Sequence, residues 1–191
     1  GQMKINAIIS QVIITLIIMV GISSCQRDLK PVEYANFIST EEDLMQEQGN
    51  DRFVVKAEYK TTEYMALREF TPESLSHSEY KQVHNSYKHS THFMVKFFAD
   101  DLRSEMLKHK FDPGETYYGR LQYFSTSIVN DFELVQNGDT TPCALHVYER
   151  AYSMRPFQQV ILVFERELDH NQNAELIYRG PYARTRPMKF K

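Results

Sequence analysis

Residues 157–165, with the sequence FQQVILVFE, form the most apolar strand-like stretch of the chain beyond its N-terminal region. Four aliphatic residues follow one another from Val160 to Val163, and a phenylalanine lies toward each end. A short apolar run that is rich in β-branched and aromatic residues predicts a buried β-strand. We therefore expect this segment to be the central strand of a sheet.

The residues that precede this strand contain a strong hairpin signal. Asn137-Gly138-Asp139 separates two strand-like stretches, residues 131–136 and 142–150, and Asn-Gly favours the tight turns that join antiparallel strands. The apolar patterns elsewhere predict further strands at residues 32–38, 53–59, 92–99, 175–179 and 188–190.

Helix-start signals are concentrated in the first two thirds of the chain. Thr40 precedes three acidic residues, Thr71-Pro72-Glu73 supplies a cap, a first-turn proline and an acid, and Asp112-Pro113-Gly114-Glu115 repeats this pattern. We expect helices at residues 40–49, 61–70, 71–87 and 113–128.

The last of these helices carries an apolar stripe, made of Tyr117, Leu121, Phe124 and Ile128. Helices in the first part of the chain and strands in the last part indicate an α+β fold. The predicted architecture is a mainly antiparallel, sandwich-like β-sheet with two to four helices in the first two thirds.

The composition is that of a folded protein. The chain has 191 residues, of which 42% are hydrophobic and 25% charged, and this excludes a disordered or collagen-like class. Its 22 basic and 25 acidic residues give a net charge of −3. This balance argues against a nucleic-acid partner, because nucleic-acid-binding proteins present a basic surface.

The first 24 residues differ from the rest, since Lys4 is their only charged residue. The apolar stretch 12–22 (VIITLIIMVGI) is followed by Ser23, Ser24 and Cys25. A positive start, an apolar core and small residues are the parts of an export signal. An uncleaved anchor is the first alternative, although a spanning helix needs about 20 apolar residues. Simple secretion is the second alternative.

Ile22-Ser23-Ser24-Cys25 resembles a lipobox, the cleavage and lipidation site of bacterial lipoproteins, in the form common in Bacteroidota. The resemblance implies that residues 1–24 are a lipoprotein signal peptide and that Cys25 carries diacylglycerol and further acyl chains such as palmitate. Two or three acyl chains anchor a protein stably. We expect an outer-membrane protein that faces either the periplasm or the cell surface, with a tether at 25–31 and a single globular domain at 32–191.

A second, diffuse resemblance covers about two thirds of the chain. The residues that carry it are Tyr59-Lys60, residues 63–67 (EYMAL), 120–124 (RLQYF), 139–143 (DTTPC) and Glu149-Arg150. This pattern is similar to small uncharacterised outer-membrane lipoproteins of Bacteroidota. It implies a shared domain and assigns no activity.

Four of the seven histidines, His77, His84, His89 and His92, lie within one short segment. A zinc site needs three or four converging ligands, and the nearby acidic residues match no known metal-binding spacing. We expect these histidines to lie on a solvated surface. A metal site formed by the four is the alternative.

Cys143 is the only cysteine besides Cys25, so acylation of Cys25 would exclude an intramolecular disulfide. Cys143 and His146 are a poor catalytic pair, because residues three apart on a strand point to opposite faces. We expect Cys143, Leu145 and Val147 to form an inward face with a buried, unreactive thiol.

Arg120, Glu149 and Arg150 are charged residues next to strongly apolar stretches. We expect them to form a buried or half-buried network that fixes the 113–128 helix on the hairpin.

Phosphate-binding loops, serine-nucleophile motifs and paired zinc cysteines are absent from the sequence, so we expect no enzymatic activity, no metal and no cofactor besides the lipid on Cys25. The 12 tyrosines and 12 phenylalanines suit interfaces. We therefore expect an accessory or scaffold subunit of an outer-membrane assembly, with the membrane and other outer-membrane proteins as partners. A free-standing module that binds a glycan, peptide or lipid in an aromatic pocket is the alternative, and an enzyme of unknown class is third.

Overall fold

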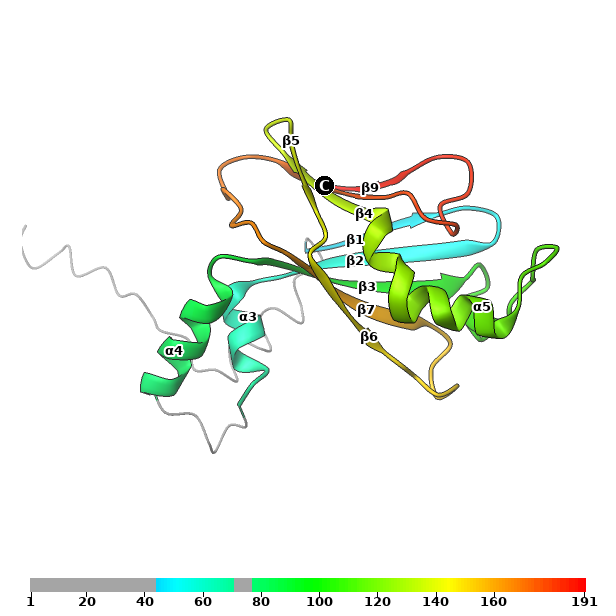
Figure 1. Cartoon of the computed structure of the whole chain (residues 1–191), viewed down its shortest axis with the longest axis horizontal. Coiled ribbons are helices and arrows are strands. Elements are labelled where there is room, and N and C mark those ends of the chain that lie inside the picture. The colour runs from blue at the N-terminus through cyan, green and yellow to red at the C-terminus, as the bar shows by residue number, and fades with distance from the viewer. Residues whose placement is uncertain (1–43, 71–76) are drawn as a thin grey trace, which may run out of the picture. The chain divides into compact units, whose positions relative to one another are not determined.

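The computed structural model describes residues 44–70 and 77–191, which all lie in the second of two units, Pro31–Lys191. These residues form two antiparallel sheets (Figure 1). In order across sheet A, the strands are β1 (Met45–Gly49), β2 (Phe53–Lys60), β3 (Thr91–Ala99), β7 (Gln158–Phe164) and β6 (Leu145–Glu149). In sheet B they are β5 (Asp139–Pro142), β4 (Phe132–Gln136), β8 (Ala174–Tyr178) and β9 (Met188–Phe190).

Three helices accompany the sheets, namely α3 (Thr62–Leu67), α4 (His77–Tyr87) and α5 (Tyr117–Gln122). A π-helical turn, Tyr123–Ser127, and a 3-10 turn, Ile128–Asp131, continue α5 toward β4, and a further 3-10 turn spans Met106–Lys108. Helices α3 and α4 lie side by side in Figure 1, away from α5. The predicted α+β, mainly antiparallel and sandwich-like fold class is confirmed.

The apolar run at residues 157–165 forms β7, which is hydrogen-bonded to β3 on one side and to β6 on the other. Both faces of β7 are buried: Val160 and Leu162 are fully buried on one face, and Ile161 is 6% exposed on the other. The strand is therefore interior as predicted, but the middle position of sheet A belongs to β3.

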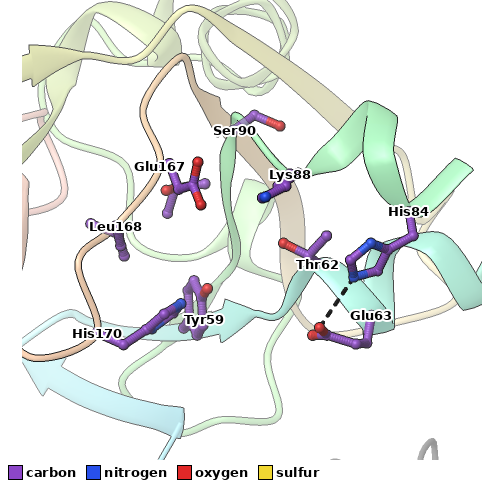
Figure 2. Close-up of a pocket in the computed structure, with 10 residues that line it drawn as sticks. Tyr59, Thr62, Glu63, His84, Lys88, Ser90, Glu167, Leu168 and His170 are labelled. Atoms are coloured by element: carbon purple, nitrogen blue, oxygen red, sulfur yellow. Dashed lines mark hydrogen bonds and ion pairs between the residues drawn. The ribbon is translucent and has the colours of Figure 1, made fainter. Parts of the chain in front are cut away.

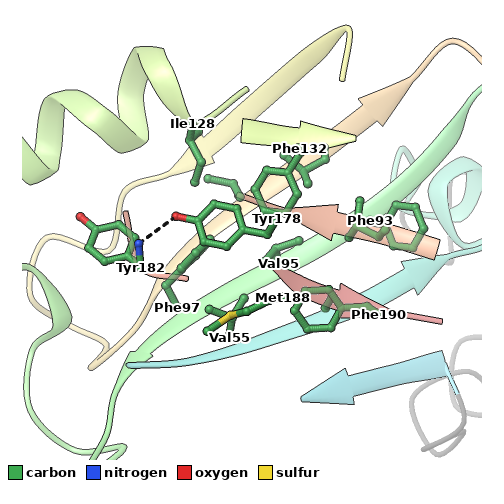
Figure 3. Close-up of a cluster of buried hydrophobic side chains, with 14 of the residues drawn as sticks. Val55, Phe93, Val95, Phe97, Ile128, Phe132, Tyr178, Tyr182, Met188 and Phe190 are labelled. Atoms are coloured by element: carbon green, nitrogen blue, oxygen red, sulfur yellow. Dashed lines mark hydrogen bonds between the residues drawn. The ribbon is translucent and has the colours of Figure 1, made fainter. Parts of the chain in front are cut away.

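The core lies between the two sheets (Figure 3). Sheet A contributes Val55, Val95 and Phe97, and sheet B contributes Phe132 and Tyr178. These side chains alternate along their strands with less buried ones, as expected for sheets that bury one face.

Phe97 of β3 is the centre of an aromatic cluster. Its ring centroid lies 5.2 Å from that of Phe124, 6.5 Å from Phe132, 5.3 Å from Tyr178 and 5.8 Å from Tyr182, all in edge-to-face geometry. Edge-to-face ring pairs contribute about 0.5–1.5 kcal/mol each beyond the burial of their area. The cluster thereby joins sheet A to sheet B and to the helical segment after α5.

A polar group closes one side of this aromatic cluster. The Tyr123 hydroxyl donates to Asp131 Oδ2 at 2.6 Å and lies 2.9 Å from the Tyr178 hydroxyl. Burial raises the pKa of both tyrosines above the ordinary value, so both hydroxyls stay protonated. Gly180 lies against these three side chains, and a Cβ atom there would overlap all of them.

The predicted turn at Asn137-Gly138 is confirmed as the connection between β4 and β5. The predicted partner strand at 142–150 is wrong, because residues 139–142 pair with β4 whereas residues 145–149 form β6 beside β7 in sheet A. Asn137 has φ 57° and Gly138 has φ 82°, the two left-handed residues of a type I′ turn. Residues 53–59, 92–99, 131–136, 175–179 and 188–190 also form strands close to the predicted bounds. The predicted strand at 32–38 lies outside the described residues.

The predicted helix at residues 40–49 is wrong in its described part, because Met45–Gly49 is strand β1. This strand pairs with β2 through a turn in which Asn50 Oδ1 accepts from the backbone N–H groups of Arg52 and Phe53, both at 3.0 Å. The backbone pairing with β2 outweighs the weak local preference of these polar residues.

The helix predicted at 113–128 begins later and is irregular. Thr116 caps α5 by accepting from the Gly119 N–H at 3.0 Å, whereas Asp112 and Glu115 form a separate turn before it. The predicted apolar stripe is confirmed, since Phe124 and Ile128 are fully buried. For the helix predicted at 71–87, α4 agrees from His77 onward, and residues 71–76 lie outside the described residues.

The two edges of sheet A differ in what covers them. Strand β1 contacts β9 of the other sheet, and the backbone N–H of Lys191 donates to Gln46 Oε1 at 2.7 Å. Strand β6 pairs with β7 alone among the described strands. Within residues 44–70 and 77–191, no helix has the length and apolar character needed to cross a membrane.

We predict that Gly180→Ala destabilises the protein by about 1–3 kcal/mol, because the added methyl forces the Tyr123, Asp131 and Tyr178 side chains apart. Urea unfolding followed by circular dichroism measures the change. Gly119→Ala is the control, since the side chain it meets is that of Thr116 alone, and we expect a change within about 1 kcal/mol there. Equal effects of the two substitutions would contradict the steric explanation.

Candidate functional site

A polar pocket of about 170 Å³ lies where β2, the end of α4 and the loop after β7 meet (Figure 2). Most of its lining side chains are charged, hydroxyl-bearing or aromatic. They are Tyr59, Thr62, Glu63, His84, Lys88, Ser90, Thr91, Glu167, Leu168 and His170.

A second, more apolar pocket of about 250 Å³ adjoins the first and opens between the two sheets. Three residues, Tyr59, Leu168 and His170, line both pockets. The other lining residues of the second pocket are Leu44, Gln46, Ala57, Phe93, Gln172, Asn173, Ala174, Leu176, Phe190 and Lys191.

Local structure positions the residues around the polar pocket. Thr61 follows β2 and caps α3 by accepting from the Tyr64 N–H at 3.2 Å, which fixes the first turn of α3 beside Tyr59. The hydroxyls of Ser90 and Thr91 donate to backbone carbonyls, at 3.0 Å and 2.5 Å. They hold the chain between α4 and β3.

The loop after β7 is tied to sheet B. Arg166 donates from its guanidinium to the carbonyls of Gln136 and Asp139, both at 3.2 Å. The Gln136 side chain in turn donates to the Asp169 carbonyl at 3.0 Å and accepts from the Asp169 N–H at 3.1 Å. These bonds place Glu167 and His170 at the pockets.

Charges of both signs face the polar pocket. His84 Nε2 lies 3.2 Å from Glu63 Oε1, and His89 Nδ1 lies 3.4 Å from Glu167 Oε2. Lys88 has no ion-pair partner within residues 44–70 and 77–191. Figure 2 shows Lys88 and Glu167 on two sides of the pocket, with the Tyr59 and His170 rings below them. This arrangement offers charged groups and aromatic surface for binding a small molecule.

The structure does not bring together His84, His89 and His92, three of the four histidines of the alternative metal site. His84 and His89 make the separate carboxylate contacts described above, and the His89 side chain is 81% exposed. His92 is 3% exposed and packs against the Tyr87 ring at 5.3 Å, so its expected surface position is wrong. His77 begins α4.

A different group of metal-type ligands occurs in the described part of the chain. One ligand atom from each of Asp100, Asp101 and His109 lies within 4.8 Å of the others. The Lys110 ammonium lies 2.7 Å from Asp100 Oδ2, and Asp101 accepts from Arg103 and Ser104. Asp101 is therefore satisfied by protein groups, whereas Asp100 Oδ1 lies 2.6 Å from His109 Nε2 and both of these buried atoms lack a hydrogen bond among the described residues.

Cys143 lies between β5 and β6, and its thiol donates to the carbonyls of Leu145 at 3.2 Å and Val163 at 3.5 Å. Burial raises the pKa of this thiol to about 11, which agrees with the expected buried thiol. His146 Nε2 instead lies 3.0 Å from the Phe124 carbonyl.

The expected inward face of Cys143, Leu145 and Val147 is wrong beyond Cys143. Leu145 is 58% exposed and Val147 is 49% exposed, because His146 and Tyr148 face the core side of β6. Cys143 does not share the alternation of β6, because it lies in the two-residue link before this strand, which begins at Leu145.

The predicted Arg120–Glu149–Arg150 network is also wrong. Arg120 is 2% exposed, and its guanidinium donates to Glu115 Oε2 at 2.6 Å and to the carbonyls of Met106, His109 and Lys110. It therefore fixes the loop before α5. The sequence shows that Arg120 is charged and lies near an apolar stretch. It does not show that the hydrogen-bond partners of Arg120 are in residues 106–115, which precede it in the chain.

The other two charges of that predicted network have separate partners. Glu149 accepts from Arg68, the residue that follows α3, at 3.2 Å and from Gln159 at 2.5 Å. The Arg150 guanidinium lies over the Tyr152 ring at 4.8 Å. Glu149 thus joins β6 to α3 across the outer face of sheet A.

Sequence reasoning missed the two pockets, because their residues are far apart in the chain. Tyr59 is in β2, Lys88 follows α4, and His170 is in the loop after β7. The one available signal was the His84–His92 segment, which borders the polar pocket through His84. Cys25, the predicted lipid-attachment residue, lies outside the described residues.

The burial of His92 predicts how the stability of the protein depends on pH. Burial lowers the pKa of His92 to about 4, whereas the unfolded chain has the ordinary value of about 6.5. Between these values unfolding takes up a proton, so the free energy of unfolding falls as the pH decreases from 6.5 to 4. We expect His92→Phe to flatten this slope in urea titrations at several pH values. His89→Phe, at an 81% exposed position, is the control for the change of side chain, and equal slopes in both variants would contradict the assignment.

Comparisons with known proteins assign no function to this site. No protein-family model and no curated protein matches the chain. Among solved structures, the chain is similar to a novel protein of unknown function from Burkholderia pseudomallei K96243. That similarity has a TM-score of 0.39 and 10% sequence identity, and it covers 83% of each chain.

Proposed function

We propose that this chain is a lipid-anchored cell-envelope protein that acts as a non-enzymatic accessory subunit of an outer-membrane assembly. The lipobox-like sequence ending at Cys25 supports the anchor. An exposed apolar strip on strand β6 and the loop after it supports the association with a partner protein.

The apolar strip consists of Leu145, Val147, Tyr152 and Met154. Their exposed fractions are 58%, 49%, 70% and 82%, so four large apolar side chains within ten consecutive residues face solvent. Exposed apolar residues scattered singly are normal on a monomer, whereas a concentration of them in one short stretch is a candidate interaction surface. This concentration is the observation that carries the proposal.

The position of the strip on a sheet edge strengthens the argument. Exposed edge strands pair readily with other chains, and proteins protect them with short polar strands, charges or proline. Strand β5, an edge of sheet B, has such protection, since it is four residues long, polar and ends at Pro142. Strand β6 carries the exposed Leu145 and Val147 instead.

The charges beside the apolar strip indicate the chemistry of the partner. Arg150 lies over Tyr152 at 4.8 Å, and Arg155 lies over Phe157 at 5.7 Å. Neither arginine has a carboxylate partner in the described ranges. A partner surface that combines apolar and acidic side chains would complement both features.

We predict that tagged wild-type protein, extracted in mild detergent, co-purifies with a defined outer-membrane protein, and that Leu145→Lys removes this partner. A lysine at this position places a charge in the apolar contact, which should reduce recovery of the partner at least about tenfold. Quantitative mass spectrometry of the co-purified proteins measures this loss.

Met45→Lys is the matched control, because Met45 is 42% exposed on β1, at the opposite edge of the same sheet. It should retain the partner. Recovery of wild-type protein alone, or equal loss in both variants, would contradict the proposed association surface.

We predict that metabolic labelling with a fatty-acid probe marks the wild-type protein and that Cys25→Ala abolishes the label, because the thioether to the lipid cannot form. In-gel fluorescence after cell fractionation measures the label and the membrane-bound fraction. Cys143→Ala should retain the label, since the Cys143 thiol is buried. Unchanged labelling of Cys25→Ala would refute lipidation at that residue.

A further inference from the structure

The apolar pocket has the size and lining of a side-chain binding site. Ala57, Phe93, Leu176 and Phe190 form buried walls that come from both sheets, with exposed fractions of 3%, 9%, 1% and 4%. The small side chain of Ala57 leaves space that a larger residue would fill. An apolar cavity of about 150 Å³ accepts benzene, so a volume of about 250 Å³ accommodates an aromatic or branched aliphatic group.

The adjoining polar pocket presents two opposite charges from different elements. Lys88 follows α4, and Glu167 is in the loop after β7. The two side chains form no ion pair with each other, and Figure 2 shows both at the pocket. Within residues 44–70 and 77–191, the ion-pair contact of Glu167 is with the exposed His89 at 3.4 Å, and such surface pairs contribute about 0–1 kcal/mol.

The two pockets are close enough for one small molecule to use both. Tyr59, Leu168 and His170 line both pockets, and the Tyr59 and His170 ring centroids are 6.2 Å apart. A ligand that lies along these rings can therefore place an apolar group between the sheets and a charged head near Lys88 and Glu167.

We propose that the two pockets form a single binding site for a small zwitterion with an apolar side chain, of the chemical class of free hydrophobic α-amino acids. The ligand carboxylate pairs with Lys88, its ammonium pairs with Glu167, and its side chain fills the apolar pocket. This site is separate from the apolar strip of β6, so the inference does not depend on the proposed function.

The charge arrangement favours a zwitterion over a singly charged ligand. A carboxylate alone would pair with Lys88 and lie near the Glu167 and Glu63 carboxylates, and an ammonium alone would lie near Lys88. A carboxylate alone offers nothing to pair with Glu167 and an ammonium alone offers nothing to pair with Lys88, whereas a zwitterion offers a group to each. Charge-assisted hydrogen bonds are the stronger ones in such small sites.

The test is isothermal titration of the full wild-type chain with three ligands that share a phenyl ring: L-phenylalanine, 3-phenylpropanoate and 2-phenylethylamine. We expect L-phenylalanine to bind at least about tenfold more tightly than either singly charged analogue, which corresponds to one charge-assisted hydrogen bond. Equal affinities for the three ligands, or no binding of L-phenylalanine, would overturn the proposal.

Four matched variants test the assigned residues. Lys88→Gln and Glu167→Gln should each weaken L-phenylalanine binding about tenfold. Lys81→Gln, on the same helical segment, and Glu165→Gln, in the same loop, do not line the pockets and should bind normally. Equal weakening by a lining variant and its control would overturn the assignment. Thermal melting of each variant establishes that it is folded before titration.

Filling the apolar pocket provides an independent readout. Ala174→Leu should reduce the affinity for L-phenylalanine at least about tenfold, because the larger side chain occupies the space of the phenyl ring. Leu145→Lys, on the apolar strip, should leave the affinity unchanged. Normal binding by Ala174→Leu would show that the ligand does not use the apolar pocket and would overturn the two-pocket site.

Discussion

The edge-to-face packing of Phe97 against four other rings is the interaction on which the rest of the structure depends. Phe97 is fully buried at the middle strand of sheet A, and its ring neighbours come from sheet B, from the segment after α5 and from the loop before β9. Large aromatic side chains bury much surface with few rotatable bonds, so a few of them can hold two sheets together. The chain has no tryptophan and its described part has no disulfide, and these tyrosine and phenylalanine rings supply the inter-sheet contacts instead.

Contacts around this core cover one edge of sheet A and hold the loop before α5. Strand β1 is held near β9 through Gln46 and Lys191, and Arg120 secures the loop before α5 by bonding to four groups in residues 106–115. The β6 edge pairs with no second strand among the described strands, and the two pockets lie at the end of the sandwich near His170. The proposed partner surface therefore lies at an unpaired sheet edge and the proposed ligand site lies at the pockets, and such features are where binding sites usually form.

Local patterns predicted the fold well where the deciding interactions are themselves local. The Asn137-Gly138 turn requires two residues with positive φ, and the sequence provides residues that tolerate it, so the hairpin could be predicted. Strand β1, Met45–Gly49, was not predicted. Its mostly polar residues have a weak preference for the β conformation, and the strand is specified by its pairing with β2. The Arg120 and Glu149 partners were mispredicted for a related reason. A charged residue near an apolar stretch indicates that it forms a polar contact in the structure. Which residue supplies that contact depends on how the loops pack.

The sequence by itself determined the fold class, most strand positions, the apolar stripe through Phe124 and Ile128, and the lipobox-like motif ending at Cys25. Each of these depends on residues that are neighbours in the chain or share a fixed period, which is why a pattern reveals them. Only the tertiary structure decided that Leu145 and Val147 face solvent and that Lys88 and Glu167 meet at one pocket. These features depend on the register between strands and on loops that bring distant segments together, and hydrophobic periodicity carries no information about either.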